Sequence, residues 1–548
     1  MQLRWIEALK RMRHMGVQED YDKLASWIRK GVDLEFDSQQ RPPRRNYRPV
    51  NQHKAEVQAR LDEYRSFGAL IHIDKNEGAD FIQPLHCIVK EGKKIRLVLD
   101  LSRNLNDYLK YHYFKYSTVQ HAVQLSYPGC WFVKVDLSNC YLSFPVSEES
   151  AKYYTVMFNG RIYRFTRLPF GLSSAPLICT RLLSVLQFVM EERNCKLLRY
   201  LDDTLFVASS ESEAQRMLEV AREVYSDFGL VINEDKTSGP TQRIIFLGIV
   251  IDSFKQSLEC TTERVQQLVE ELQGIKAQQW ITRAAYDSLL GRLSFAAQVL
   301  PGSKPFTRWM RDTGKGLSNA RNTHIPITTE FRVDIQFWLD RISTWNGRES
   351  WQSNHTAPFI LASDASDAGF GFYMEQEDFR CGGNGPGMEP NALNGPVNGI
   401  GFSGKFEEEL RNMDIGTKEM FAVLAAVNTF ADRMRNSAVQ IMCDNEGDVA
   451  ILNRQQSKSQ AISGILRAIF SLAFSHNLNI TAVHRPGIEN ELADFLSRPN
   501  RHGDNYLAAW CDAHPDQAHR LLRVDVIDSR VIQHLSLMDS SKNSQNTQ

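Results

Sequence analysis

The 548-residue sequence is poor in features that would mark a secreted or membrane protein. Its nine cysteines lie singly between Cys87 and Cys511 and never at CxxC spacing, which excludes a disulfide framework or a zinc knuckle. No apolar run reaches the roughly eighteen residues of a membrane span, and the first residues do not resemble a signal peptide. We therefore expect a soluble intracellular protein without a membrane partner, in a cytoplasmic particle or in the nucleus.

The sequence also lacks an excess of either charge. Lys and Arg number 64 and Asp and Glu number 65, for a net charge of -1, so a nucleic-acid surface would have to be a local patch. One basic arm stands out at residues 41–49, RPPRRNYRP, where prolines prevent a helix and leave four arginines exposed. This arm either contacts phosphates or is a solvated linker.

What is present indicates a large folded chain. Hydrophobic residues make up 42% and charged residues 24%, the composition of globular proteins, and the length predicts three to four domains of roughly 150 residues. Up to residue 252, short β-rich runs alternate with helical stretches, which indicates an α+β domain with an antiparallel sheet. The segment SESEAQRMLEVAREVYSDFG is predicted to be a helix whose apolar stripe packs under the sheet. Two helices are predicted over residues 253–300, the second ending at the Pro-Gly pair 301–302, and strands return at FILASDASDAGFGFYM.

A first set of carboxylates follows β-prone runs. Asp136 ends WFVKVD, and Asp202 with Asp203 falls in a tight turn between LLRYL and TLFVAS, which predicts a hairpin whose tip presents two acids. Adjacent carboxylates repel one another unless a cation neutralises them, and two Mg²⁺ ions would use these charges to bridge attacking and leaving oxygens. The alternative is an ordinary solvated acidic turn.

Six segments identify the context of these acids. They occur in the order IVKEGKKIRLVLDLS, VDLSNCYLSF, LPFGLSSAP, YLDD, GLVINEDKT and IIFLGIVID. Together they resemble retroelement reverse transcriptases. The resemblance implies a right-hand polymerase with fingers, an antiparallel palm sheet and a thumb, in which Asp136 and Asp202 bind two Mg²⁺ ions, or Mn²⁺ in their place, and Asp203 supports them.

The same resemblance assigns residues to the incoming dNTP. Arg96 and Lys90 would hold the triphosphate, with Lys93 or Lys94 as alternatives because the hairpin turn is short. Tyr141 matches the aromatic residue that blocks a ribose 2′-hydroxyl. Phe170 and Gly171 match the segment beneath the incoming base and the templating nucleotide, and Lys236 is a structural or nucleotide-proximal lysine.

A second series of acids lies in the last third of the chain. Its members are Asp364 in ASDAS, Glu419 in GTKEMFAVLAA, Asp444 in IMCDNEG and Asp494 in NELADFLSR. The series resembles the DEDD set of RNase H-like domains, which sits on a mixed sheet and two helices and binds two Mg²⁺ ions.

Other acids and one histidine complete this assignment. Glu407, Glu408 and Glu409 compete with Glu419 for the second position, although KEMFAVLAA matches the family better. Asp367 and Asp448 receive no role. His484 stands ten residues before Asp494, as does the histidine that assists proton transfer or product departure in RNase H relatives.

The predicted organisation follows from these segments. We expect an α+β multidomain chain with an N-terminal helical extension (1–45), fingers and palm (46–252), thumb (253–302), connection (303–355), an RNase H-like domain with a mixed sheet (356–500) and a partly disordered tail (501–548). The predicted activity is RNA- and DNA-directed DNA synthesis with degradation of the RNA strand. Its partners would be an RNA template, a DNA primer, the RNA–DNA hybrid and dNTPs.

Three questions stay open at this stage. GLSSAP, LLGRLSFAAQVLPG and HRPGIENELADFLSRP are most similar to DIRS-type elements and next to gypsy-type elements, and the lack of an integrase motif favours the former without excluding a truncated form of the latter. A non-catalytic RNA-binding scaffold and a polymerase with an inactive nuclease are the alternative functions. The oligomeric state is not predicted.

Overall fold

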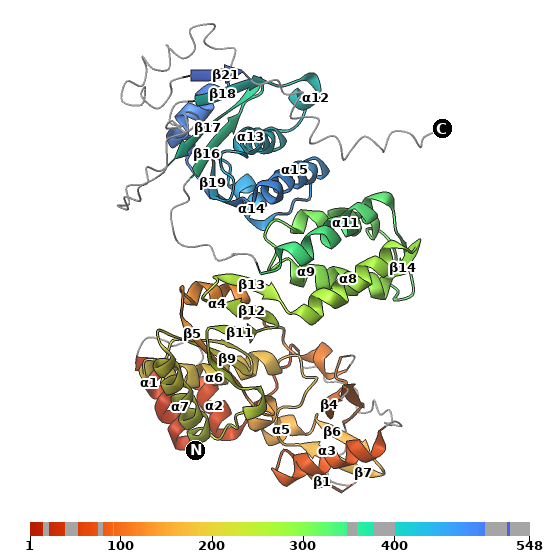
Figure 1. Cartoon of the computed structure of the whole chain (residues 1–548). Coiled ribbons are helices and arrows are strands. Elements are labelled where there is room, and N and C mark those ends of the chain that lie inside the picture. The colour runs from red at the N-terminus through yellow and green to blue at the C-terminus, as the bar shows by residue number, and fades with distance from the viewer. Residues whose placement is uncertain are drawn as a thin grey trace. The chain divides into compact units, whose positions relative to one another are not determined.

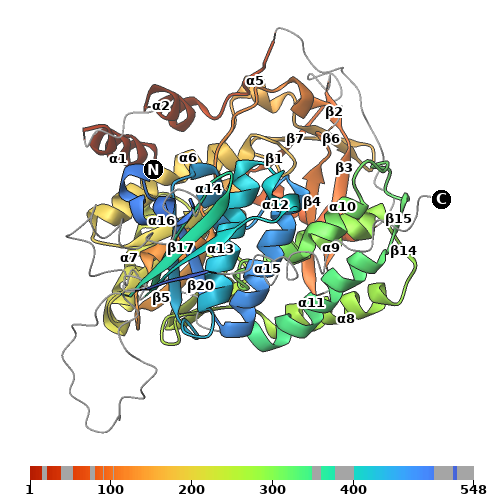
Figure 2. The same cartoon turned by 90° about the horizontal axis from the view of Figure 1, so that it is seen from above.

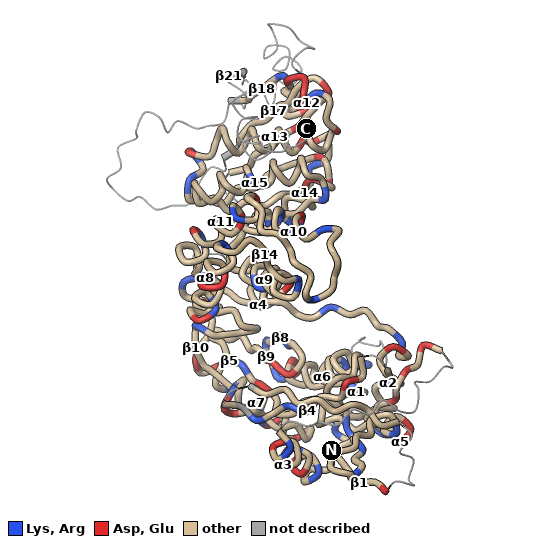
Figure 3. The backbone as a smooth tube through the Cα atoms, turned by 90° about the vertical axis from the view of Figure 1, so that its right-hand side faces the viewer, with Lys and Arg blue, Asp and Glu red and all other residues tan. Residues whose placement is uncertain are grey.

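The structure is a computed structural model that describes residues 1–14, 21–38, 53–74, 81–90, 92–102, 104–347, 359–376, 400–498 and 523–526. It forms two compact units, Met1–Ser257 and Leu258–Gln548, which meet in the sequence within strand β13 (Ser257–Cys260). The basic arm at 41–49 lies outside the described residues. Within both units, basic and acidic residues are interspersed along the backbone (Figure 3).

The first unit combines seven helices with twelve complete strands in its described part. Its helices are α1 (Gln2–His14), α2 (Tyr21–Lys30), α3 (Lys54–Ser66), α4 (Val119–Leu125), α5 (Glu148–Ala151), α6 (Ala175–Glu192) and α7 (Glu211–Asp227). Its strands are β1 (Leu70–Ile73), β2 (Ile82–Gln83), β3 (Leu85–Lys90), β4 (Lys93–Leu99), β5 (Trp131–Asp136), β6 (Thr155–Phe158), β7 (Arg161–Phe165), β8 (Leu197–Tyr200), β9 (Asp203–Ala208), β10 (Ser238–Thr241), β11 (Arg243–Phe246) and β12 (Ile249–Asp252).

The central sheet of this unit has the order β10-β5-β9-β8. All of its neighbouring strands are antiparallel, which confirms the predicted antiparallel sheet. Phe132, Val133, Leu205 and Phe206 are fully buried, because both faces of the two central strands are covered by other parts of the unit. The sheet is therefore a fixed platform for side chains at its strand ends.

Helix α7 covers this sheet. Ser210 caps it by accepting a hydrogen bond from the Glu213 amide, and it contacts β5 and β9. The predicted apolar stripe is buried, as expected for a helix with one core-facing side; its members are Met217, Leu218, Ala221, Val224, Tyr225 and Phe228. The Tyr225 hydroxyl lies 2.8 Å from Thr204 Oγ1, so the helix is also fixed to β9 by a buried polar contact.

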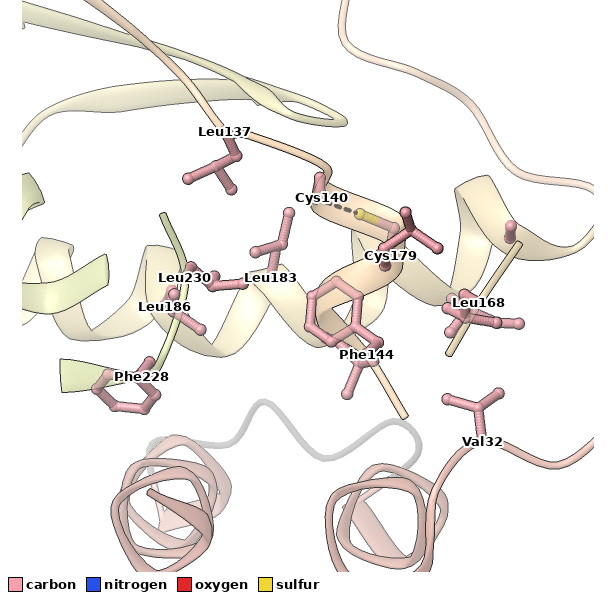
Figure 4. Close-up of a cluster of buried hydrophobic side chains, with 14 of the residues drawn as sticks. Val32, Leu137, Cys140, Phe144, Leu168, Cys179, Leu183, Leu186, Phe228 and Leu230 are labelled. Carbon is pink, nitrogen blue, oxygen red and sulfur yellow. Dashed lines mark hydrogen bonds between the residues drawn. The ribbon is translucent and has the colours of Figure 1, made fainter. Parts of the chain in front are cut away.

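Helix α1 packs against both α2 and α6, and α1 and α2 lie next to each other in Figure 2. Trp5 is 7% exposed, donates its indole N–H to the Phe228 carbonyl at 3.1 Å and meets the Phe144 and Phe228 rings edge-on. Figure 4 shows Phe144 and Phe228 in a cluster with Leu183 and Leu186 of α6. The N-terminal extension is thus part of the core of the first unit.

Two smaller sheets complete the first unit. One has the order β1-β7-β6-β2, and the other is the antiparallel hairpin of β3 and β4, in which Ile88 lies opposite Arg96. The end of β4 contacts the LPFG loop, since the Leu99 amide donates to the Phe170 carbonyl at 2.9 Å. This contact fixes the hairpin beside the central sheet.

The second unit begins with a helical region. It contains α8 (Thr262–Lys276), α9 (Arg283–Ala296), α10 (Arg308–Thr313), α11 (Thr329–Trp345) and the short strands β14 (Trp280–Thr282) and β15 (His324–Pro326). Helices α8 and α9 confirm the two helices predicted over residues 253–300. Gly302, which follows the predicted stop at Pro301, has φ +85°, a conformation that glycine adopts without strain.

A six-stranded mixed sheet forms the rest of the second unit. Its order is β20-β19-β16-β17-β18-β21, with parallel and antiparallel pairs, as predicted. The strands are β16 (Phe359–Ala365), β17 (Gly369–Gln376), β18 (Ile400–Lys405), β19 (Ala438–Cys443), β20 (Asn479–His484) and β21 (Arg523–Val526). The helices are α12 (Glu408–Arg411), α13 (Ile415–Phe430), α14 (Glu446–Arg454), α15 (Gln460–His476) and α16 (Glu491–Leu496).

Side chains on the two faces of β17 pack against different helices. Phe370 packs on Phe421 of α13, with ring centroids 5.4 Å apart. The next residue but two, Tyr373, packs with Leu492 and Leu496 of α16. Because successive side chains of a strand point to opposite faces, α13 and α16 cover opposite sides of the sheet.

Helix α15 is joined to α11 by an aromatic cluster and a buried ion pair. The Phe306 and Phe337 rings stack with centroids 3.5 Å apart, and Phe474 meets Phe337 edge-on. Asp334, fully buried, pairs with Arg467, which is 4% exposed, and also accepts the Met310 amide at 3.1 Å. The helical region and the six-stranded sheet therefore share one packed core. None of the helices in the described ranges is both long and apolar enough to cross a membrane.

This ion pair generates a stability prediction. Asp334→Ala leaves the Arg467 guanidinium buried without its carboxylate, which typically costs about 3–5 kcal/mol. We expect amide hydrogen exchange in α11 and α15 of the full chain to accelerate by at least about 100-fold. Asp287→Ala, which removes an ion pair with Arg283 on α9, is the matched control and should leave these rates unchanged. Equal protection in both variants would contradict a contribution of the pair to the core.

Two candidate carboxylate centres

The first centre lies where β5 ends beside the turn between β8 and β9. Asp136 is the last residue of β5, Asp203 is the first residue of β9, and the two lie directly opposite each other in the antiparallel ladder. Asp202 occupies the turn after Leu201, whose φ is +53°, and its carbonyl accepts the Leu137 amide at 3.2 Å. The structure thus brings the three predicted acids together. The turn consists of Leu201 and Asp202, and Asp203, which was predicted to lie in the turn, is the first residue of β9.

Burial and mutual repulsion set the electrostatics of this centre. Burial, followed by the charge of Asp136, raises the pKa of Asp202. Burial and the charge of Asp202 raise the pKa of Asp203 to about 6. Among the described residues, Lys236 forms an ion pair with this centre, and its Nζ lies 2.9 Å from Asp136 Oδ1. The centre has more negative charge than this single ammonium can balance.

This donor set fits hard divalent cations. Carboxylate oxygens are the ligands that Mg²⁺ prefers, and two ions would remove the repulsion that raises these pKa values. As they stand, the described residues contain no group of three or more His, Cys, Asp or Glu side chains arranged to hold a metal ion. Lys236, predicted to be structural or close to the nucleotide, contacts a carboxylate directly.

Residues predicted to bind the dNTP surround the first centre. The Arg96 guanidinium lies 5.1 Å from the centre of the Phe170 ring, and Phe170 in turn contacts Tyr141 with ring centroids 5.3 Å apart. Arg96 is exposed on β4. Its positive charge acts on Asp202 and offsets a small part of the rise in the pKa of that acid. These three side chains therefore form one continuous surface.

Gly171 shows why the LPFG loop contains glycine. Its φ is +108°, and a Cβ placed there would lie 1.9 Å from the Leu99 carbonyl oxygen. Its own carbonyl accepts the Asn106 side-chain amide at 2.9 Å. The loop can approach β4 this closely only without a side chain.

The lysines of the β3–β4 turn are described unequally. The backbone of Lys90 pairs with that of Lys93, but their side chains lie outside the described part of the chain. Lys94 is exposed, with Nζ 3.5 Å from Glu63. Which lysine reaches a triphosphate stays a prediction.

The second centre gathers the four acids predicted for it. Asp364 on β16 is 7% exposed, and Asp444 follows the neighbouring parallel strand β19. Burial, and then the charges of Asp444, Asp494 and Glu419, raise the pKa of Asp364 to about 7. Glu419 comes from α13, and its carboxylate accepts the Asn445 amide at 2.7 Å. All four carboxylates are close enough to act electrostatically on one another.

Asp494 of this centre, His484 and Asp367 each have a defined partner. Asp494 on α16 pairs with Arg498, one turn later. His484, the last residue of β20, is exposed, and its Nε2 lies 3.0 Å from the Asp444 backbone carbonyl oxygen. Asp367, given no role from the sequence, pairs with the buried ammonium of Lys418 at 3.2 Å.

Sequence reasoning missed Asp448. This residue of α14 is 3% exposed, its Oδ2 is buried without a hydrogen-bond partner, and burial followed by contact with Glu419 raises its pKa to about 8. The available signal was its position four residues after Asp444, in the first turn of the helix that follows the same strand end. The second centre therefore contains a fifth carboxyl group.

Comparisons with known families agree with this division. Residues 86–251 match the family model "Reverse transcriptase (RNA-dependent DNA polymerase)", which includes the whole first centre. Residues 354–469 match the model "RNase H-like domain found in reverse transcriptase". That match includes Asp364, Glu419 and Asp444 and ends before His484 and Asp494.

Individual relatives are retroelement polyproteins. The chain is 23% identical over 379 residues to the retrovirus-related Pol polyprotein from transposon gypsy of Drosophila melanogaster, covering 68% of this chain and 33% of that protein. It is 22% identical over 495 residues to the transposon Tf2-3 polyprotein of Schizosaccharomyces pombe, covering 89% and 34%. The chain thus spans about a third of the length of these curated relatives.

Solved structures share the fold. The foamy viral protease-reverse transcriptase dRH in complex with double-stranded DNA superposes with a TM-score of 0.53 at 16% identity, over 83% of this chain and 74% of that one. The foamy viral protease-reverse transcriptase with double-stranded DNA gives 0.51 at 15% identity, over 85% and 94%. These similarities confirm the fold class predicted from the sequence.

The approach of Gly171 to β4 generates a second prediction. Gly171→Ala should destabilise the first unit by about 2–4 kcal/mol, because the new methyl group meets the Leu99 carbonyl and φ is unfavourable. Gly160→Ala is the control, since Gly160 also has positive φ but nothing within 4 Å of its Cβ position, and should cost about 1–2 kcal/mol. Thermal unfolding of both full-length variants checks this; equal losses would show that the contact is unimportant.

Proposed function

We propose that this chain, which contains a reverse transcriptase domain and an RNase H-like domain, is a retrotransposon enzyme that synthesises DNA on RNA or DNA and degrades the RNA of the resulting hybrid. The first centre would extend a primer 3′-hydroxyl with dNTPs, and the second would hydrolyse the RNA strand. One observation supports this most strongly: the seven predicted carboxylates form two clusters, in which Asp136 and Asp364 are buried and the others partly buried, and burial with mutual repulsion raises the pKa values of Asp203 and Asp364.

The resident cations would be Mg²⁺, replaceable by Mn²⁺, with two ions in each centre. Asp136 and Asp202 would hold them in the first centre, and Asp364, Glu419, Asp444 and Asp494 in the second. Bound there, the ions would supply charge stabilisation for phosphodiester chemistry. Asp203 adds negative charge to the first centre, and Asn445 fixes the orientation of the Glu419 carboxylate.

The side chains around the first centre suit a dNTP. The exposed guanidinium of Arg96 can neutralise charge on the departing pyrophosphate, and Lys90 would act beside it. The base and sugar would lie against Arg96, Phe170 and Tyr141, whose two rings meet edge-on at 61°, and Tyr141 would exclude a ribose 2′-hydroxyl. Lys236 would hold Asp136 in place before metal binds.

The nucleic-acid partners would be an RNA template, a DNA primer and the RNA–DNA hybrid. Solved relatives with this fold are described in complex with double-stranded DNA and with an RNA/DNA hybrid. The rival function, a non-catalytic scaffold, would have no use for seven acids whose burial is costly. The intracellular location remains a prediction from the scattered cysteines.

We further propose that the element is of the DIRS type. The motifs GLSSAP, LLGRLSFAAQVLPG and HRPGIENELADFLSRP support this assignment, and gypsy-type elements are the alternative. Sequencing the genomic DNA on both sides of the coding region tests it. A tyrosine recombinase reading frame would support the DIRS type, and an integrase frame between long terminal repeats would refute it.

Two substitutions test the proposed activities separately. Asp202→Asn should lower primer extension by about 10³-fold or more and leave hybrid cleavage intact, whereas Asp444→Asn should do the reverse, because losing a catalytic carboxylate typically costs this much. The assay uses the full chain, a labelled RNA–DNA primer-template, dNTPs and Mg²⁺, with extension and RNA cleavage scored side by side.

Asp367→Asn is the matched control, because this carboxylate is fully exposed and forms its ion pair with Lys418. Both activities should persist in it. Joint loss of both activities in Asp202→Asn and in Asp444→Asn would contradict two separate centres. An inert wild-type protein in Mg²⁺ and in Mn²⁺ would support the scaffold.

A further inference from the structure

The segment Leu109–Ser117 runs in extended form between a 3₁₀ turn (Leu105–Tyr108) and α4. From Tyr111 to Lys115 the exposure alternates: Tyr111, Tyr113 and Lys115 are exposed, whereas His112 and Phe114 between them are half-buried. Lys110 before this stretch and Tyr116 after it are also exposed. This alternation is that of a strand with one solvated face. Two large aromatic rings thus share the face that the protein does not cover.

The opposite face of the segment is held in place. The Lys110 amide donates to the Glu35 carbonyl at 2.8 Å, and His112 Nε2 lies 3.0 Å from Glu35 Oε2. Phe114 meets the Tyr116 ring with centroids 4.7 Å apart. The segment is therefore anchored at both ends, and the exposed rings are presented in a defined register.

The anchoring also places the segment beside the first centre. Tyr116 packs against Tyr200 with ring centroids 5.2 Å apart. Tyr200 is the last residue of β8, directly opposite Asp203 in the ladder, and precedes the turn that carries Asp202. Three rings in contact, Tyr200, Tyr116 and Phe114, thus connect the strand before Asp202 with the half-buried face of the segment.

The exposed rings are unusual for a surface without a ligand. Tyr111 is 82% exposed and Tyr113 is 73% exposed. Single exposed aromatic residues are common, but here two share a face, and the exposed ammonium groups of Lys110 and Lys115 flank them. Aromatic rings between cationic side chains are the combination that binds single-stranded nucleic acids.

We propose that Tyr111 and Tyr113 form a stacking surface for unpaired bases of a nucleic-acid strand, with Lys110 and Lys115 contacting its phosphates. Alternate residues of an extended chain are about 6.6 Å apart, close to twice the 3.4 Å stacking rise of bases, so one base fits between the two rings. The proposal rests on the proposed function, in which this strand is the single-stranded template beside the polymerase centre.

The chemistry favours a strand over a protein partner. Stacking is possible with any base, as a template-copying enzyme requires, and the flanking charges are positive. Glu35, the acid that contacts the segment, already forms ion pairs with Lys23 and His112. A protein ligand would be expected to need further apolar surface around the rings.

Binding measurements with two DNA substrates test the proposal. Fluorescence anisotropy, in EDTA and without dNTPs, gives Kd for a blunt duplex and for the same duplex with a 5′ single-stranded template overhang. Tyr111→Ala and Tyr113→Ala should each raise Kd for the overhang substrate about tenfold and leave Kd for the blunt duplex unchanged. Tyr111→Phe/Tyr113→Phe, which keeps both rings, should bind like wild type.

Salt dependence separates stacking from charge. The alanine variants of the tyrosines should keep the wild-type slope of log Kd against log salt, whereas Lys110→Ala/Lys115→Ala should flatten it, because only the lysines displace counterions. Unchanged Kd in the tyrosine variants, or equal loss on both substrates, overturns the proposal. Because the rings are exposed, unchanged thermal unfolding verifies that the variants fold.

Primer extension by the wild-type protein, run in parallel, keeps the two hypotheses distinct. If it extends primers and the tyrosine variants bind both substrates normally, the stacking surface is refuted and the proposed polymerase stands. If it binds the overhang through the rings but extends no primer with either metal ion, the polymerase is refuted and the surface stands.

Discussion

Repulsion between buried carboxylates is the constraint on which this protein depends. Asp136, Asp202 and Asp203 are drawn together because a fixed antiparallel ladder puts a strand end opposite a hairpin turn, not because the acids attract one another. The sheet and α7 supply the packing that offsets this cost, and Lys236 removes part of it. Such a cluster favours cation binding, because a bound cation removes the repulsion that the fold imposes on the carboxylates.

The second unit meets the same constraint with a different topology. Here parallel strands β16 and β19 end side by side, and helices on both faces of the sheet bring further acids to that edge. Asp364 is almost completely buried, so its environment penalises charge more than that of an exposed acid. Asp448 adds to the penalty and contacts Glu419, which couples the conformation of α13 to that of α14.

Much of this could be predicted from the sequence, because several of the candidate acids end strongly β-prone runs and the family motifs are local. The antiparallel and mixed sheets, the α7 core stripe and the gathering of both acid sets followed from such patterns. Long-range contacts could not be predicted in this way. The pairing of Lys236 with Asp136 spans 100 residues, the docking of Trp5 on Phe228 spans 223, and the burial of Asp448 depends on where α13 lies. The roles of these site residues remain predictions, as do the domain limits.

The shared core of α11 and α15 has a consequence for how the protein can be divided. Phe337 and Trp345 of α11 both contact Phe474 of α15, and the Asp334–Arg467 pair crosses the same boundary. A fragment starting at residue 356 would lack Asp334, Phe337 and Trp345 and would leave Arg467 and Phe474 facing water, so its natural folding partner is the helical region before it. Insertion, recombination and exchange between elements should therefore preserve this pair of segments as one inherited block.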